Sequence, residues 1–346
     1  ALEKGYTAAS RINDAPIVFD DPGIEDIWRP ENYSGKTYGP TRIREALIRS
    51  RNLVSIRLLH AIGIPWAMDH IAKFGFDTDK LPGNLSLALG SGAISPWQLA
   101  SAYCILANGG YKVEPYFIDR IESYNDEIIF QASPLVICRD CDLPAEMPEE
   151  SSNIDDEIAE PAESADEASE VAADIDENNE EELTINYSPQ VIKPQNIWIM
   201  QSMMRDVIQH GTGRKAKALK RSDLAGKTGT TNDQRDAWFS GFNSSLVTIS
   251  WVGFDQFKPL GNGETGGKAS LPMWIKYMKV ALEDVPEIKR DPPGGMLNLR
   301  INKKTGLATS SNDPDAFFEI FRVEHAPAPN NQESDPDPYN PDDQDV

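Results

Sequence analysis

The sequence predicts an α+β fold in which an antiparallel sheet is flanked by helices. Three strand-like segments follow one another at residues 227–231, 237–243 and 246–255, and a short turn joins the last two. Such short connections favour antiparallel pairing. Residues 194–210 before this group and the segment from Pro272 after it have the apolar spacing of helices. Consecutive strands bounded by helices are typical of α+β domains.

The 346 residues carry a net charge of −22, but the negative charge is concentrated in two segments. Residues 140–182 contain 19 acidic and no basic residues, and residues 324–346 contain another 7 acidic residues with none, so that the remainder carries +4. Segments this acidic cannot bury enough apolar surface to offset the entropy of ordering. We therefore predict a disordered insertion at 137–190, a disordered tail at 324–346, and one domain assembled from residues 1–136 and 191–323.

The sequence gives no sign of nucleotide or nucleic-acid binding. Residues 35–37 and 226–228 read Gly-Lys-Thr, but a phosphate-binding loop needs a glycine five positions earlier, where Pro30 and Arg221 stand. The small positive excess and the lack of a nucleic-acid-binding motif argue against a nucleic-acid partner. No segment has the pattern of a membrane span or a signal peptide. We expect no cofactor.

The three cysteines do not indicate a metal site. Cys104 lies in an apolar helix-like segment, where a buried free thiol is expected. Cys138-Arg139-Asp140-Cys141 has C-x-x-C spacing, but it lacks the second pair or nearby histidine that would complete four zinc ligands. We interpret the pair as a short local disulfide formed in an oxidising compartment, with a redox centre as the alternative.

The first elements of the chain are marked by local signals. Residues 1–4 followed by Gly5 are typical of the last turn of a helix and its C-cap, so the chain is predicted to begin inside an element. A strand is predicted within residues 12–20, and an ordered loop at 28–35. Thr41 is predicted to be the N-cap of the next helix.

Three further helices and a hairpin are predicted before the acidic insertion. The helices cover residues 53–62, 66–74 and 96–108, and the last one has Ser95 as its N-cap and Pro96 in its first turn. Residues 116–121 and 128–131 form the hairpin, with Asn125-Asp126 at its turn.

Two polar motifs lie among these predicted helices and strands and are candidates for a functional site. Ser50-Arg51-Asn52 falls at a junction between two predicted helices, where Ser and Asn taken alone are ordinary capping residues. Lys227-Thr228-Gly229 lies on a polar strand and offers a cation, a hydroxyl and close approach to the backbone, which suits a substrate with a carboxylate. A second copy of the tripeptide, residues 304–306, is predicted to be the turn of a hairpin between 296–301 and 306–308.

Together these motifs resemble the transpeptidase domain of class A, bifunctional penicillin-binding proteins, whose fold is like that of the serine β-lactamases. The resemblance rests on Asn32-Tyr33, Gly39-Pro40, residues 44–47, Ser50-Arg51-Asn52, residues 89–91, Ser95-Pro96 and residues 107–111, 226–231, 236–239 and 265–267. A C-x-x-C followed by an acidic insertion is similar to the 1A branch of this family in Gram-negative bacteria. The resemblance covers most of the chain outside the insertion and the tail.

The resemblance implies a peptidoglycan D,D-transpeptidase that cross-links the cell wall by serine acyl transfer and is a target of β-lactams. It implies catalytic roles for Ser50, Asn52 and Lys227. Ser50 would relay a proton to the leaving amine, and Asn52 would bind the substrate amide and fix a neighbouring lysine.

The resemblance also implies that residues 227–231 bind substrate. The Lys227 ammonium and the hydroxyls of Thr228 and Thr230 would hold the terminal carboxylate of a stem peptide, and Gly229 and Thr231 belong to the same segment. The backbone N–H of Thr230 is implied as one half of an oxyanion hole.

One part of the family pattern is missing. The nucleophile and its base occupy a Ser-x-x-Lys before Ser-x-Asn, and no Ser-x-x-Lys occurs in this sequence. We expect that motif immediately before residue 1, with a glycosyltransferase domain and a membrane anchor also outside this incomplete domain. The chain by itself is then predicted not to form a penicilloyl ester.

Two alternatives stay open. The motifs do not separate a transpeptidase from a D,D-carboxypeptidase, in which water replaces the acceptor amine, and a non-catalytic module that binds stem peptides would keep the same carboxylate site. The resemblance implies a periplasmic domain, anchored to the inner membrane through a segment outside this sequence, with stem peptides and β-lactams as ligands. It leaves a homo-oligomer open.

Overall fold

The computed structural model describes residues 1–19, 28–138 and 186–328, which form two compact units. One unit contains Ala1–Pro115 and the chain from Gln190 onward, and the other contains Tyr116–Pro189. Most of the predicted insertion and the predicted tail lie outside the described residues, so their disorder stays a prediction.

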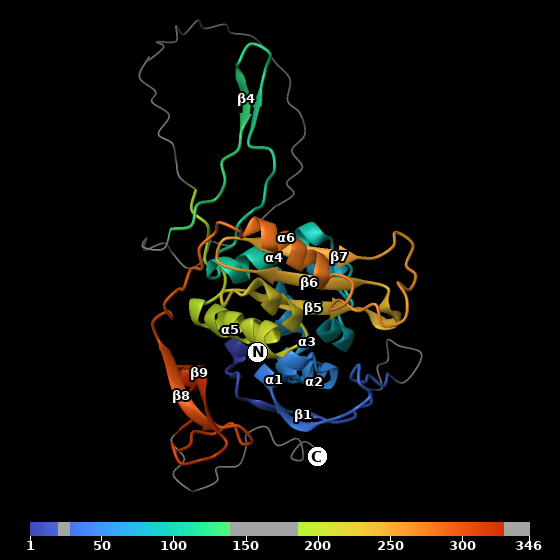
Figure 1. The fold of residues 1–346 in the computed structure, drawn as a ribbon, viewed down its shortest axis with the longest axis vertical. Coiled ribbons are helices and arrows are strands. Elements are labelled where there is room, and N and C mark those ends of the chain that lie inside the picture. Colours follow the sequence, from blue (N-terminus) through green and yellow to red (C-terminus); the bar gives the residue numbers. More distant parts are fainter. Residues whose placement is uncertain (20–27, 139–185, 329–346) are drawn as a thin grey trace, which may run out of the picture. The chain divides into compact units, whose positions relative to one another are not determined.

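The predicted group of strands forms a three-stranded antiparallel sheet in the order β5-β6-β7 (Figure 1). The strands are β5 (Ala225–Thr230), β6 (Ala237–Phe242) and β7 (Val247–Val252). Lys227 lies opposite Ser240, and Gly229 lies opposite Trp238. Opposite residues of an antiparallel pair share a face, so these four residues belong to one side of the sheet. The α+β prediction is confirmed.

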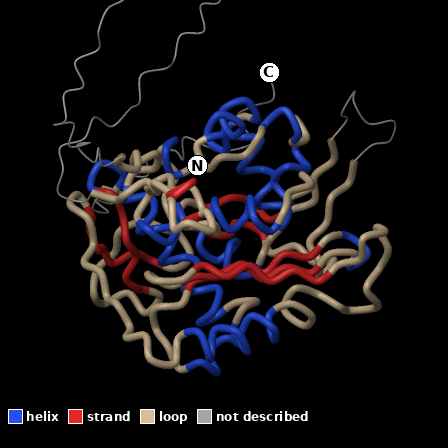
Figure 2. The backbone as a smooth tube through the Cα atoms, turned by 90° about the horizontal axis from the view of Figure 1, so that it is seen from above, coloured by secondary structure: helices blue, strands red, loops and turns tan. Residues whose placement is uncertain are grey.

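Helices cover both faces of this sheet (Figure 2). On one face lies α6 (Leu271–Ala281), whose Trp274 is fully buried with its ring 4.9 Å from that of Phe239, edge to face. On the other face lie α4 (Pro96–Asn108) and α5 (Pro194–His210), where Met204 and Phe242 share an apolar cluster. Each fully buried aromatic side chain stabilises such a layer by about 2 kcal/mol.

The helix starts follow their local signals. Ser95 and Gln98 form a reciprocal capping box at the start of α4, and α5 begins at Pro194, as predicted. The predicted helix junction is also confirmed, since Ser50 and Arg51 separate the first two helices. The N-terminal helices are α1 (Ile43–Arg49), α2 (Asn52–Ile62) and α3 (Ile64–Ala72).

The prediction that Thr41 is a helix N-cap is wrong. Thr41 lies in β2 (Gly39–Arg42), which pairs with β1 (Arg11–Asp14), and it stands opposite Ile12. The pairing commits its backbone to the strand, so Arg42 takes the N-cap position without a side-chain hydrogen bond. Propensity for capping is overridden here by pairing with a distant strand.

The first strand also lies earlier than predicted. It ends at Asp14, and within the later part of the expected segment Phe19 forms only a single bridge, with Trp28. At the start of the chain, Leu2–Lys4 forms a 3-10 turn that ends at Gly5 in the left-handed conformation, as expected for a helix end.

The C-terminal hairpin differs from the prediction in its second strand. β8 (Met296–Asn302) pairs with β9 (Ala316–Arg322), whereas Ala308 makes only an isolated bridge. Lys304-Thr305-Gly306 forms the expected turn, because Asn302 Oδ1 accepts hydrogen bonds from the N–H groups of Lys304 and Thr305. The chain then crosses a further polar loop before the paired strand begins.

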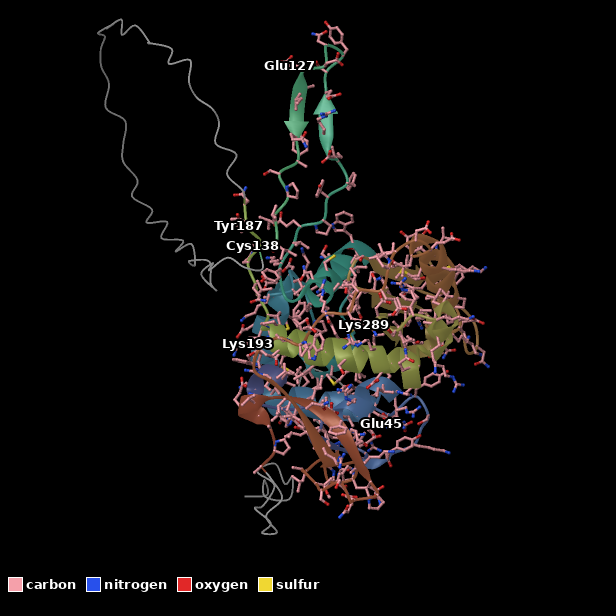
Figure 3. All side chains as sticks on the ribbon, turned by 60° about the vertical axis from the view of Figure 1, so that its left-hand side comes forward. Glu45, Glu127, Cys138, Tyr187, Lys193 and Lys289 are labelled. Carbon is pink, nitrogen blue, oxygen red and sulfur yellow. The ribbon has the colours of Figure 1, made fainter. Side chains whose placement is uncertain are left out.

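The smaller unit contains the predicted hairpin. β3 (Arg120–Glu122) pairs with β4 (Ile128–Gln131) across a turn in which Asp126 has a φ of +62°. Glu127 lies at the turn end of the unit, and Cys138 and Tyr187 lie at the other end (Figure 3). Cys138 forms a disulfide, and the other half of the C-x-x-C lies outside the described residues. Cys104 of the larger unit is a free, partly exposed thiol.

Short 3-10 turns complete the list of helices. They cover Leu2–Lys4, Thr78–Lys80, Leu85–Leu89, Arg214–Leu219, Asn232–Gln234 and Val323–His325. Within the described residues no helix combines the length and apolar character needed to cross a membrane.

Arg44 of α1 is a buried cation that connects three elements. It donates two hydrogen bonds to the carboxylate of Glu319 in β9, at 2.8 and 2.6 Å, and one to Asp206 in α5, at 2.7 Å. The Glu319 side chain is only 1% exposed, so its charge depends on these partners. The C-terminal hairpin is thereby fixed to the helix that leads to Ser50.

We expect Arg44→Met to destabilise this chain by about 3–5 kcal/mol, because Glu319 would remain buried without its bidentate partner. Urea unfolding measures the loss. Arg49→Met is the matched control, because Arg49 pairs with Glu45 on the exposed side of the same helix and such pairs contribute about 0.5 kcal/mol or less. Equal losses in the two variants would contradict the role of the buried network.

Candidate active site

Ser50 and Lys227, which are 177 positions apart in the sequence, meet in the folded chain. Lys227 Nζ donates a hydrogen bond to Ser50 Oγ at 2.9 Å and another to the backbone oxygen of Thr228 at 2.8 Å. Ser50 comes from the junction of α1 and α2, and Lys227 comes from β5. The two motifs singled out from the sequence therefore belong to one site.

Burial changes the acidity of Lys227. The side chain is partly exposed but follows two buried residues of β5, and burial lowers the pKa of its ammonium from 10.5 to about 8. A charge is less stable away from water, and no carboxylate among the described residues offsets this effect. An anion bound at Nζ would favour the protonated form, so the site is suited to a carboxylate.

Ser50 combines the capping position expected at a helix junction with a side-chain contact to Lys227. It ends α1 in the left-handed conformation, with a φ of +54°, and its backbone N–H donates to Ala46 and Leu47. Residues other than glycine adopt this conformation at a cost of about 1 kcal/mol or more. The surrounding contacts hold it there with its hydroxyl exposed and directed at Lys227.

Asn52 is held beside the site by a different partner. It is the first residue of α2, and its Nδ2 donates to the backbone oxygen of Glu31 at 2.8 Å. No hydrogen bond joins it to Lys227 within the described part of the chain. Its oxygen stays available for a ligand, and the substrate contact implied by the resemblance stays a prediction.

A buried polar group supports the Ser50–Asn52 junction, and sequence reasoning missed its role. Asn32 is 4% exposed, donates to Asp14 Oδ1 at 2.7 Å and accepts from the N–H of Leu53 at 3.4 Å. It thus caps α2 from another segment. The sequence signal for this role was an asparagine in a loop that lacks apolar periodicity. The residue that it caps, Leu53, lies 21 positions further along the chain, so the contact could not be read locally.

Thr212 is a second residue that the sequence did not single out. Its Oγ1 lies 2.7 Å from Thr228 Oγ1, within hydrogen-bond distance of the strand that carries Lys227. Thr212 follows the end of α5, where Gly211 leaves no room for a Cβ, since one would approach the Ile48 oxygen to 2.4 Å. In the sequence, the glycines on both sides of Thr212 were the signal that its backbone packs closely against other segments.

Thr230 is tied to the loop after β7. Its Oγ1 accepts a hydrogen bond from the N–H of Gly266 at 3.0 Å, and its hydroxyl proton is free to donate to a ligand. A Cβ at Gly266 would lie 2.2 Å from the oxygen of Trp238 and 2.4 Å from that of Gly229. Only glycine allows this loop to reach the strands.

Thr231 has a structural role in this arrangement. Its Oγ1 accepts hydrogen bonds from the N–H groups of Arg235 and Asp236, at 3.1 and 2.8 Å, and so stabilises the turn between β5 and β6. The substrate-binding role implied for Thr231 by the resemblance stays a prediction. The described residues contain no cluster of three or more His, Cys, Asp or Glu side chains that could hold a metal ion.

Comparison with known proteins places this geometry in context. The family model described as penicillin binding protein transpeptidase domain matches residues 1–255. Penicillin-binding protein 1A of Pseudomonas aeruginosa is 46% identical over 331 residues, which are 94% of this chain and 40% of the relative. The chain thus spans about 40% of that relative's length.

Solved structures show the same similarity. The crystal structure of penicillin-binding protein 1A from Haemophilus influenzae has a TM-score of 0.79 and 33% identity, over 94% of this chain and 46% of that one. PonA1 from Mycobacterium tuberculosis in complex with penicillin V has a TM-score of 0.59 and 21% identity, over 84% of this chain and 68% of that one. The second likeness concerns the fold alone.

We expect the penalty for burying the Lys227 charge to depend on pH. The folded pKa of about 8 is lower than the value of 10.5 for an unperturbed lysine, so below pH 8 the protonated lysine destabilises the folded chain, and this effect disappears as the pH rises to 10.5. The stability advantage of Lys227→Met should therefore shrink across this range in urea unfolding. Lys304→Met, which removes an exposed lysine paired with Asp315, should show no such trend below pH 10.5. Parallel curves for both variants would contradict the assignment.

Gly266→Ala is expected to destabilise the chain by about 1–3 kcal/mol, because the new methyl group overlaps two backbone oxygens. Gly267→Ala is the control, since its Cβ would meet nothing closer than 3.4 Å. Thermal unfolding of both variants tests the close approach. The same shift for both would show that the loop can move aside.

Proposed function

We propose that this chain, which belongs to the family of penicillin-binding protein transpeptidase domains, forms the substrate-holding part of a peptidoglycan D,D-transpeptidase. The contact between Ser50 and Lys227 is the observation that carries the proposal. It places a partly buried ammonium against a serine hydroxyl and the backbone oxygen of Thr228. The second Lys-Thr-Gly has no such surroundings, because its lysine is exposed and paired with Asp315.

The proposed reaction is acyl transfer in two steps. A serine hydroxyl of the longer protein attacks the carbonyl carbon between two terminal D-alanines, the peptide C–N bond breaks, and the leaving amine takes up a proton as a serine ester forms. An amine from a neighbouring stem peptide then attacks the ester and restores the serine. This chain contains no Ser-x-x-Lys, so the attacking serine and its base belong to sequence outside it.

The residues of this chain bind the substrate and move a proton. Lys227, Thr228 and Thr230 hold the terminal carboxylate by charge-assisted hydrogen bonds. The Thr230 N–H stabilises the oxyanion that develops on the attacked carbonyl. Ser50 Oγ, which accepts from Lys227 Nζ at 2.9 Å, donates its own proton to the leaving amine and is reprotonated through the lysine. The lowered pKa of Lys227 makes this ammonium a better proton donor than an exposed lysine.

β-Lactams are proposed as ligands of the same site, because they present a carboxylate beside a strained amide as the stem peptide presents one beside its scissile bond. We place the domain in the periplasm, held at the inner membrane by another part of the longer protein. The disulfide at Cys138 supports an oxidising compartment.

The function is tested by fluorescent-penicillin labelling of a longer protein that includes a Ser-x-x-Lys before this chain. We expect Lys227→Ala to slow labelling about 10²-fold or more, because the cation that stabilises the bound carboxylate and the developing charge is lost. Lys304→Ala, in the second copy of the tripeptide, is the control and should leave the rate unchanged. Equal rates in all three proteins would refute the role of Lys227.

This chain alone should not be labelled. Covalent labelling of the 346 residues by themselves would show that a nucleophile is present among them and that the proposed division of the site is wrong. A product assay with a stem-peptide substrate, with and without an acceptor amine, separates the transpeptidase from a carboxypeptidase.

A further inference from the structure

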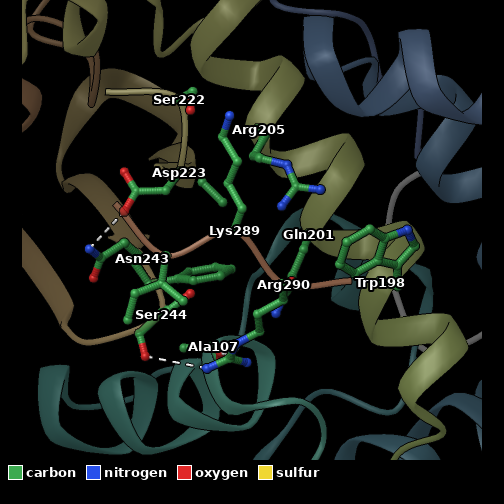
Figure 4. Close-up of a pocket in the computed structure, with 13 residues that line it drawn as sticks. Ala107, Trp198, Gln201, Arg205, Ser222, Asp223, Asn243, Ser244, Lys289 and Arg290 are labelled. Carbon is green, nitrogen blue, oxygen red and sulfur yellow. Dashed lines mark hydrogen bonds between the residues drawn. The ribbon is translucent and has the colours of Figure 1, made fainter. Parts of the chain in front are cut away.

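A pocket opens beside α5, at the end of the sheet where β5 begins and β6 ends (Figure 4). Its volume is about 250 Å³, and α4, α5 and the loop after α6 also contribute to its walls. Neither Ser50 nor Lys227 lines it. We call it the α5 pocket.

The walls of the α5 pocket carry an excess of positive charge. Arg205, Lys289 and Arg290 line it, against a single carboxylate, that of Asp223. Asp223 is already neutralised, because Arg221 donates two hydrogen bonds to it at 2.9 and 2.8 Å and Asn243 donates a third at 3.1 Å. The net charge offered to a ligand is therefore positive.

The nearby carboxylate of Glu287 is also engaged. It accepts hydrogen bonds from the N–H and the hydroxyl of Ser222, at 3.1 and 2.6 Å, at the edge of the pocket. Arg290 has a structural role in the wall, since it donates to the backbone oxygens of Ala107 and Ser244. These groups form the wall of the pocket, and none of them pairs with its other two cations, Arg205 and Lys289.

Arg205 and Lys289 supply those two cations from different elements. The Arg205 guanidinium lies 5.5 Å from the ring of Trp198 on the same helix, and no described carboxylate forms an ion pair with it. Burial lowers the pKa of Arg205, so its charge is incompletely solvated and gains from an anionic partner. Lys289 is exposed at the pocket and forms no ion pair or hydrogen bond within the described residues.

The rest of the lining is apolar or aromatic and includes Trp198, Phe242 and Ile288. A volume of about 250 Å³ is just below the ~300–1,000 Å³ typical of pockets for drug-sized ligands, so the occupant must be compact. We propose that the α5 pocket binds a compact organic anion, with one phosphate or carboxylate group between Arg205 and Lys289 and a ring or short apolar body against Trp198 and Phe242.

Isothermal titration calorimetry of this chain with phenyl phosphate tests the proposal. We expect binding that Arg205→Gln and Lys289→Gln each weaken about tenfold, which corresponds to the loss of one charge-assisted hydrogen bond. Lys279→Gln is the matched control, because it removes an exposed lysine of α6 outside the pocket. Lys289 is exposed, so its substitution keeps the fold, and thermal unfolding of each variant verifies this.

Three further ligands separate the contribution of the charged group from that of the ring. Benzyl alcohol has the ring without the charge, and inorganic phosphate has the charge without the ring, so both should bind more weakly than phenyl phosphate. Benzoate distinguishes a carboxylate site from a phosphate site by its affinity relative to phenyl phosphate. No binding of either aromatic anion, equal binding of benzyl alcohol, or the same loss in Lys279→Gln as in the pocket variants would overturn the proposal.

Discussion

The hydrogen bond from Lys227 to Ser50 is the interaction on which the arrangement of this site depends. It joins a strand in the second half of the chain to a helix junction in the first half, and it requires an ammonium at a position where burial lowers its pKa to about 8. No described carboxylate compensates this cost. The fold therefore retains a charge that is best stabilised by a ligand, as expected for a functional site rather than a structural ion pair.

Arg44 shows how a structural ion pair differs from the site at Lys227. Arg44 is also buried, but Glu319 and Asp206 surround it with charge-assisted hydrogen bonds, and the network fixes three elements to one another. Arg44 has its anionic partners within the chain, whereas Lys227 has none among the described residues and is proposed to bind a ligand. The α5 pocket shares the second property, since Arg205 and Lys289 form no ion pair among the described residues.

Close backbone packing around β5 makes the site possible. The loop at Gly266 touches the oxygens of Trp238 and Gly229, and its N–H reaches the Thr230 hydroxyl. At the end of α5, Gly211 lets Thr212 approach Thr228. The loop at Gly266 and the end of α5 thus both approach β5 closely because glycines stand at the contact points.

The sequence alone determined the elements whose signals are local, and it identified the motifs. The capping box at Ser95, the proline that begins α5 and the turn at residues 304–306 each depend on neighbours a few positions away. The likeness of Ser50-Arg51-Asn52 and Lys227-Thr228-Gly229 to a family was also visible in the sequence. Only the tertiary structure decided that Thr41 pairs in a strand, that β8 pairs with β9, and that Thr212 and Asn32 support the site. These outcomes depend on contacts between distant segments, whose pairing energies outweigh the local propensities that a sequence displays.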